Sequence, residues 1–204
     1  MAEAAAPRRF STVWLALAVV VGLLLGYAGG LLTPIVRAPD DTSAEAGFAR
    51  DMSVHHAQAV ELAMIAYQKA TNEDVRSLAY KIVTTQQAQI GVMKRWLEEW
   101  RLEPTGSQPR MAWMPGGGEP LANGLMPGMA TNQEVDRLRQ SSGKDVDRQF
   151  VELMIRHHLG GIHMVEGLLK VSHRPEVVTL ATVMKNGQQN EITVMRDLQR
   201  DASN

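Results

Sequence analysis

The histidines of this chain are concentrated in two copies of one short pattern. The stretches MSVHH at 52–56 and MIRHH at 154–158 each place a methionine three residues before a histidine pair, and together they hold four of the six histidines. Imidazole and thioether are ligands that suit Cu(I), and its mimic Ag(I), better than iron or zinc. The chain has no cysteine, which excludes thiolate metal sites, disulfides and cysteine nucleophiles. The pattern therefore predicts soft-metal binding by Met52, His55, His56, Met154, His157 and His158.

Helical geometry places these histidines beside a buried seam. At about 100° per residue, Met52 shares one helix face with small and apolar residues, and His55 and His56 flank that face. An antiparallel neighbouring helix would bring glutamines and a methionine opposite the histidines, and the second copy repeats the arrangement. We therefore expect these residues in one polar layer: Gln86, Gln87, Gln89 and Met93, then Gln188, Gln189, Glu191 and Met195.

This layer has more than one chemical interpretation. The copper interpretation adds Met93 and Met195 to the ligands, whereas zinc held by the histidines is the alternative ion. The layer could also be a set of core histidines hydrogen-bonded to glutamines, which would fix the helix register without any metal. Two symmetric copies, each with its own methionine, favour the metal-binding interpretation.

Four further methionines lie in a stretch rich in glycine and proline that interrupts all helical periodicity. Met111-Ala-Trp-Met114 and Met126-Pro-Gly-Met129 are two M-x-x-M pairs with few other apolar residues around them. They form a candidate labile Cu(I) site in a loop. The alternative is that these methionines cover the end of the helical domain.

The two histidine pairs belong to an internal duplication. A shift of 102 positions places His55 on His157, and it also pairs Phe48 with Phe150, with no gap over about fifty residues. Helical periodicity is present throughout, capping boxes are predicted to start at Thr42, Thr71 and Thr131, and no segment alternates like a strand. The predicted fold class is all-α, namely a ferritin-like four-helix bundle made of two duplicated helical hairpins. Its parts are a hairpin at 43–102, the loop at 103–130 and a hairpin at 131–204.

The N-terminal part has a different character from the rest of the chain. Residues 13–32 carry no charge and are long enough to cross a bilayer as a helix. The basic pair Arg8 and Arg9 orients the first twelve residues, 1–12, towards the cytoplasm, with residues 33–42 as a linker outside. We expect an uncleaved transmembrane anchor, and a signal peptide is the alternative.

Composition and motifs exclude several functional classes. The chain has 204 residues, is 45% hydrophobic and carries a formal charge of −1, without the basic patch of a nucleic-acid-binding protein. It contains no Glu-x-x-His, which carboxylate-bridged di-iron bundles use, and no phosphate loop or nucleotide fingerprint. We therefore expect a binding protein rather than an enzyme. A ferritin-like metal-dependent oxidoreductase is the less favoured alternative.

The histidine patterns also carry a family resemblance. The runs FARDMSVHHAQAVELA and LMPGMATNQEVDRLRQSSGKDVDRQFVELMIRHHLGGIHMVE resemble the bacterial family known as domain of unknown function 305, over about residues 43–200. The resemblance implies a ferritin-like bundle that is exported or tethered to the membrane, and a link to copper binding and resistance in some members. It also implies that both M-x-x-H-H patterns are the signature positions. His163 departs from the acid that is usual at its position.

Together, the residues and the resemblance predict an extracytoplasmic, metal-binding protein anchored by a single membrane helix. Its domain would lie on the periplasmic or cell-surface side, where it would buffer copper, transfer it or confer resistance. The expected partners are the metal ion, the membrane, and a metal-delivery protein or a second copy of the chain. The alternative from a different class is a structural or interaction module that binds no metal.

Overall fold

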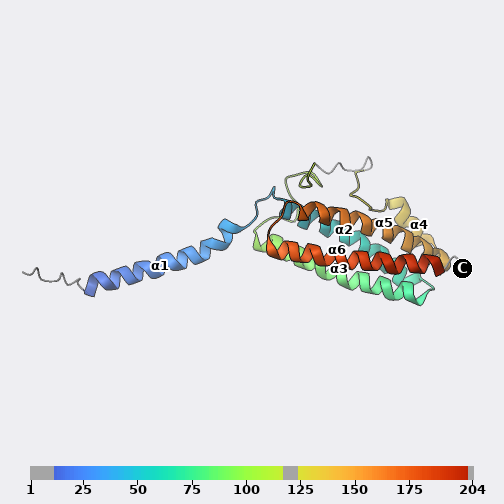
Figure 1. Ribbon diagram of the computed structural model, residues 1–204, viewed down its shortest axis with the longest axis horizontal. Coiled ribbons are helices and arrows are strands. Elements are labelled where there is room, and N and C mark those ends of the chain that lie inside the picture. Colours follow the sequence, from blue (N-terminus) through green and yellow to red (C-terminus); the bar gives the residue numbers. More distant parts are fainter. Residues whose placement is uncertain (1–11, 117–123, 202–204) are drawn as a thin grey trace, which may run out of the picture. The chain divides into compact units, whose positions relative to one another are not determined.

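The structure is a computed structural model of the chain, and it describes residues 12–116 and 124–201 (Figure 1). Every regular element in these ranges is a helix, which confirms the all-α class. The chain divides into two compact units, Met1–Ala38 and Pro39–Asn204.

From residue 12 onward, the first unit contains one helix, α1, which spans Thr12–Arg37. Its part Thr12–Gly30 is long and apolar enough to cross a membrane, and a signal sequence would have the same properties. The predicted cytoplasmic segment lies outside the described residues except for Thr12. The role of α1 as an anchor therefore stays a prediction.

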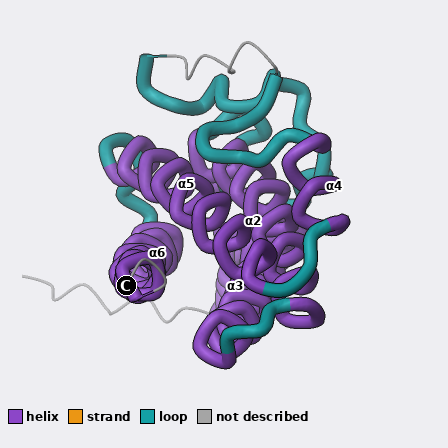
Figure 2. The backbone as a smooth tube through the Cα atoms, turned by 90° about the vertical axis from the view of Figure 1, so that its right-hand side faces the viewer, coloured by secondary structure: helices purple, strands orange, loops and turns teal. Residues whose placement is uncertain are grey.

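The second unit is a helical bundle with one short extra helix. Helix α2 packs along α3, α5 packs along α6, and α2 also packs against α5, as the end-on view in Figure 2 shows. The short helix α4 contacts α2 and α5. The bounds are α2 Ala44–Lys69, α3 Glu73–Glu99, α4 Asn132–Gln140, α5 Lys144–Leu169 and α6 Pro175–Asp201.

The helix starts follow local capping chemistry, with two differences from the predicted caps. The capping box of Thr131 and Glu134 at the start of α4 is confirmed. At α2, however, the cap is Ser43 rather than Thr42, whose hydroxyl donates to Asp40 instead. At α3 the cap is Asn72 rather than the preceding threonine, whose hydroxyl donates to a carboxylate of α5. Competing polar partners thus move both caps by one residue.

The core consists of two apolar clusters. The aliphatic cluster includes Leu62, Ile82 and Met154, and the methionine cluster includes Met52 and Met164. Helix α2 enters the methionine cluster with its first half and the aliphatic cluster with its second half, while α5 does the reverse. The two helices therefore run antiparallel, and their middle parts lie between the clusters.

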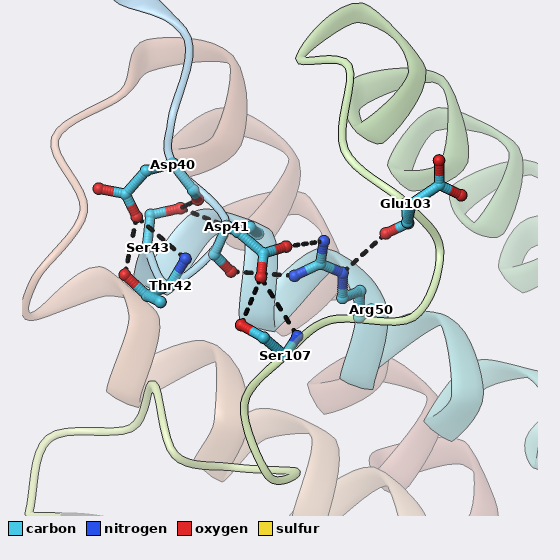
Figure 3. A network of polar contacts seen from close by, with 8 residues as sticks. Asp40, Asp41, Thr42, Ser43, Arg50, Glu103 and Ser107 are labelled. Carbon is cyan, nitrogen blue, oxygen red and sulfur yellow. Dashed lines mark hydrogen bonds and ion pairs between the residues drawn. The ribbon is translucent and has the colours of Figure 1, made fainter.

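The described parts of the long connection between α3 and α4, residues 100–116 and 124–131, cover the face formed by α2 and α5, on the side away from α3 and α6 (Figure 2). Figure 3 shows its beginning, where Arg50 of α2 donates to the Glu103 carbonyl and to Asp41. Ser107 donates to the same Asp41 carboxylate from the loop. These hydrogen bonds lower the pKa of Asp41 to about 2 and fix the loop to the start of α2.

Candidate metal centre

Four histidines form a buried layer where α2 and α5 cross. His55 and His56 come from α2, His157 and His158 come from α5, and none is more than 1% exposed. The layer lies between the aliphatic cluster and the methionine cluster, because these residues sit at the middle of both helices. The predicted burial of both histidine pairs is confirmed.

Three of the four rings donate a hydrogen bond from Nε2 to an oxygen. His55 donates to the Pro127 carbonyl at 2.9 Å, and His56 donates to Gln89 Oε1 at 2.7 Å. His158 donates to the Glu191 carboxylate at 2.8 Å. An imidazole that donates from Nε2 and is neutral carries its lone pair on Nδ1. In all three rings Nδ1 is buried and has no hydrogen-bond partner.

His157 differs from the other three because neither of its ring nitrogens has a hydrogen-bond partner. Its ring lies against that of His55, with centroids 3.9 Å apart and planes tilted by 37°. The ring of His158 is 6.4 Å away. His157 is therefore the ring of the layer that hydrogen bonds constrain least.

Burial keeps the rings of His55, His56 and His157 uncharged. Desolvation lowers the pKa of His55 to about 4, and desolvation together with the nearby His55 lowers the pKa of His56 to about 3. Desolvation also lowers the pKa of His157 well below 6.5, and the neighbouring histidines act in the same direction. Neutral imidazoles can coordinate a metal at neutral pH without first losing a proton.

Two glutamine side chains complete the layer. Both polar atoms of Gln86 and the Oε1 atom of Gln188 are buried without a partner. Gly161 makes room for the second amide, because a Cβ atom there would lie only 2.6 Å from Gln188 Oε1. The predicted neighbours Gln87 and Gln189 are exposed and do not belong to the layer.

The predicted methionine ligands do not gather at one point. Met52 and Met93 lie in the methionine cluster, whereas Met154 and Met195 lie in the aliphatic cluster on the other side of the histidines. Each M-x-x-H-H pattern therefore extends in an opposite direction from the layer, since α2 and α5 are antiparallel. All four side chains are fully buried.

The loop methionines are part of the core. Met111, Met114 and Met126 are buried in the methionine cluster, and Met129 packs against it. The carbonyl between the second pair, that of Pro127, accepts the hydrogen bond from His55. The second M-x-x-M pair thus lies directly over the histidine layer.

Carboxylate contributes little to this centre. Among residues 12–116 and 124–201, no three His, Asp or Glu side chains are arranged to hold a metal ion by themselves. Glu191 is the one acid bonded to a layer histidine in that part of the chain, and Lys81 of α3 approaches it at 3.9 Å. The donor set fits a soft ion with few ligands better than a di-iron centre.

Sequence reasoning missed the groups that attach the loop to the layer. The Gln58 side chain forms two hydrogen bonds with the Ala130 backbone, at 2.7 and 2.8 Å. Asp51 accepts hydrogen bonds from the Met111 amide and from the Trp113 indole. Both residues stand next to the histidine pattern on α2, but nothing in their spacing indicates a partner some 60 to 72 residues away. His163 and His173 are exposed, as expected for residues outside the site.

The family described as Domain of unknown function (DUF305) matches residues 45–199 of this chain. A putative secreted DUF305 protein from Streptomyces coelicolor is 42% identical, with a TM-score of 0.73, and the match covers 79% of this chain and 95% of that one. A DUF305 fragment from Deinococcus radiodurans is 33% identical, with a TM-score of 0.64 and coverages of 79% and 96%.

A third similar structure is CopM in the Cu(II)-bound form, which is 28% identical with a TM-score of 0.61 and coverages of 78% and 97%. CopM in the Cu(I)-bound form is similar at 25% identity, with a TM-score of 0.59 and coverages of 81% and 99%. No curated protein matches the chain.

Proposed function

This chain belongs to the DUF305 family, and we propose that it is an extracytoplasmic copper protein whose histidine layer binds Cu(I) or Ag(I). It would buffer the ion, transfer it or confer copper resistance. Copper-bound structures of the related CopM support this proposal, as does the relative from Streptomyces coelicolor that is described as a putative secreted protein.

The observation that carries the proposal is the orientation of the buried rings. Metal-binding histidines commonly donate one ring N–H to a carbonyl or carboxylate, which fixes the other nitrogen as the ligand. His55 and His158 have this arrangement, with Nε2 bonded to an oxygen and Nδ1 buried and free. His157 adds one further lone pair, since a neutral ring carries one and neither of its nitrogens has a hydrogen-bond partner. An apolar core has no other use for so many unpaired lone pairs, because each one costs free energy when buried.

The wider architecture of the proposal follows the same reasoning. We interpret the hairpins at 43–102 and 131–204 as a ferritin-like four-helix bundle, with the loop at 103–130 as a cover over the histidines. Helix α1 would anchor the bundle to the outer side of the membrane through the predicted linker at 33–42, whose first part, up to Arg37, continues α1. The ion would then be exchanged with a delivery protein or with a second copy of the chain.

The test is anaerobic titration with Cu(I) against a competing chelator. The informative variant is His157→Leu, because neither ring nitrogen has a hydrogen-bond partner, so the change breaks no hydrogen bond and should keep the fold. The matched control is His163→Leu on the exposed face of the same helix. We expect binding tighter than about micromolar in the wild type, and a large loss only in the His157 variant.

Two results would overturn the proposal. One is the absence of Cu(I) uptake tighter than about micromolar by the wild-type protein. The other is equal uptake by both variants and the wild type, which would favour a structural histidine layer. Preference for Zn(II) over Cu(I) in a parallel titration would assign the layer to the alternative ion.

A further inference from the structure

The two apolar clusters differ in a way that the duplication makes visible. The shift of 102 residues pairs Leu62 with Met164 and Ile82 with Met184. The first member of each pair lies in the aliphatic cluster, and the second lies in the methionine cluster. Equivalent places in the core are thus filled by branched hydrocarbons at one end and by thioethers at the other.

The loop increases this difference. The aliphatic cluster holds two buried methionines, Met154 and Met195. The methionine cluster holds seven, with Met129 packed against them, and six of these seven are at most 1% exposed. The seven are Met52, Met93, Met111, Met114, Met126, Met164 and Met184.

A buried acid distinguishes the same end of the bundle. The Asp51 carboxylate is 6% exposed, and it accepts hydrogen bonds from the Met111 amide at 2.7 Å and the Trp113 indole at 2.8 Å. Its equivalent in the second copy is Leu153, which belongs to the aliphatic cluster. The acid and the extra thioethers therefore occur together.

We propose that the methionine cluster is a second metal site, in which Met164 and Met184 bind Cu(I) or Ag(I) with thioethers of the loop. This proposal rests on the proposed function, since it extends the same soft-metal cargo to a site without histidine. Thioethers are neutral ligands that select Cu(I). A monovalent cation in an apolar core needs a compensating charge nearby, and the Asp51 carboxylate supplies it.

Core packing alone does not explain the distribution of methionines. Methionine fills irregular gaps, and a loop packed on helices leaves such gaps. Helix positions 164 and 184, however, have equivalents at 62 and 82 that are filled by leucine and isoleucine. The hydrogen bonds of Asp51 attach the loop to α2, and its carboxylate also places a buried negative charge at the same end of the bundle.

The surface next to this cluster offers a route for the ion. A pocket of about 500 Å³ lies between the start of α2 and the loop. Asp51, Trp113 and Ala112 line it, so it reaches the segment that carries Met111 and Met114. An ion entering there would meet the Asp51 carboxylate, which is bonded to the backbone of the first loop methionine.

The test compares Ag(I) or Cu(I) stoichiometry and X-ray absorption spectra of the full chain and its variants. Met164→Leu with Met184→Ile installs the residues of the first copy, which keeps side-chain volume and should keep the fold. The matched control is Met64→Leu, since Met64 is exposed on α2 and lies outside both clusters. The His157→Leu variant weakens the histidine layer separately.

We expect the double variant to bind one ion fewer than the wild type and to lose the sulfur-only component of the spectrum. The His157→Leu protein should keep that component, and Met64→Leu should match the wild type. Asp51→Asn should raise the Kd of the sulfur-only site about tenfold. Wild-type stoichiometry and spectrum in the double variant would overturn this inference, while a loss of uptake in His157→Leu would leave the proposed function standing. Absence of uptake in the wild type would overturn both.

Discussion

The two copies of the histidine pattern occupy equivalent places but have different partners. His56 and His158 each donate to a residue 33 positions later, yet the acceptor is the Gln89 amide in one copy and the Glu191 carboxylate in the other. His55 donates to the loop, whereas its equivalent, His157, has no hydrogen bond. A duplicated sequence has thus produced an asymmetric layer.

The loop is the physical cause of much of this asymmetry. It crosses the face of α2 and α5 once, so it cannot contact both copies in the same way. Gln58 binds the Ala130 backbone, while its equivalent, Gly160, lets the Pro127 carbonyl approach α5 closely. The first copy therefore binds the loop by hydrogen bonds, whereas the second copy makes room for it. The second copy also contains His157, the ring without a hydrogen bond.

Lowering the pH should cause the largest loss in the free energy of unfolding among the changes considered for the layer. The pKa values of His55, His56 and His157 are lowered in the folded protein, so between about pH 6.5 and 4 the unfolded chain holds more protons. Their stabilisation is fully present above pH 6.5 and is lost as the pH falls towards 4. At pH 5 each of the three should cost about 2 kcal/mol of the free energy of unfolding. Urea unfolding of the wild type at a series of pH values measures this loss.

In the same pH series, the histidines and the carboxylates lose their contributions to stability over different pH ranges. Hydrogen bonds to Arg156 lower the pKa of Glu134 to about 2, so its contribution, like that of Asp41, is lost only below about pH 4.5. His157→Leu should reduce the slope between pH 6.5 and 4 by about one proton. A slope equal to that of the wild type would show that His157 is not a buried neutral ring.

Gly160→Ala tests the place where the second copy accommodates the loop. A Cβ atom there would collide with the Pro127 carbonyl, which belongs to backbone that cannot simply rotate away. We expect a loss of about 2–3 kcal/mol in the free energy of unfolding, measured by urea denaturation. Gly187→Ala is the control, because an added Cβ meets no atom within 4 Å and should stabilise its exposed helix position by up to about 1 kcal/mol. Equal behaviour of the two variants would mean that the loop does not rest on α5.

The sequence predicts the helices and the buried layer because both depend on periodicity. The 3.6-residue repeat and the duplication place both histidine pairs between apolar stripes, and the structure has them there. The caps of α2 and α3 shift by one residue, since Asp40 and Asp147 compete for the threonine hydroxyls. Asp147 is 76 residues from the threonine that it binds, so this competitor is not visible in a local pattern.

The loop contacts are beyond sequence reasoning for the same physical reason. A glycine- and proline-rich segment has no helical period. Nothing local therefore indicates that the Pro127 carbonyl accepts a hydrogen bond from His55, or that Gln58 binds the Ala130 backbone. The roles of the histidines and methionines as metal ligands stay predictions. The extra thioethers at 164 and 184 become visible when the duplicated halves are compared position by position and assigned to their clusters.

Replacing the acceptor of His56 or of His158 by alanine should lower the free energy of unfolding by different, smaller amounts in the two copies. Glu191→Ala leaves the N–H of His158 buried and unpaired, and it removes a charged acceptor. Gln89→Ala does the same to His56 with a neutral acceptor. We expect losses of about 2–3 and about 1–2 kcal/mol in the free energy of unfolding, since hydrogen bonds to charged groups are the stronger ones.

Glu191→Gln should have the smallest effect, because it gives the second copy the acceptor of the first. The amide oxygen still accepts from His158, so only the charge contribution is lost, about 1 kcal/mol in the free energy of unfolding. Lys81, at 3.9 Å from this carboxylate and largely exposed, loses little when the charge disappears. If Glu191→Gln instead costs as much as Glu191→Ala, the carboxylate charge rather than its hydrogen bond holds His158. The two copies would then differ in the physical force that orients their rings.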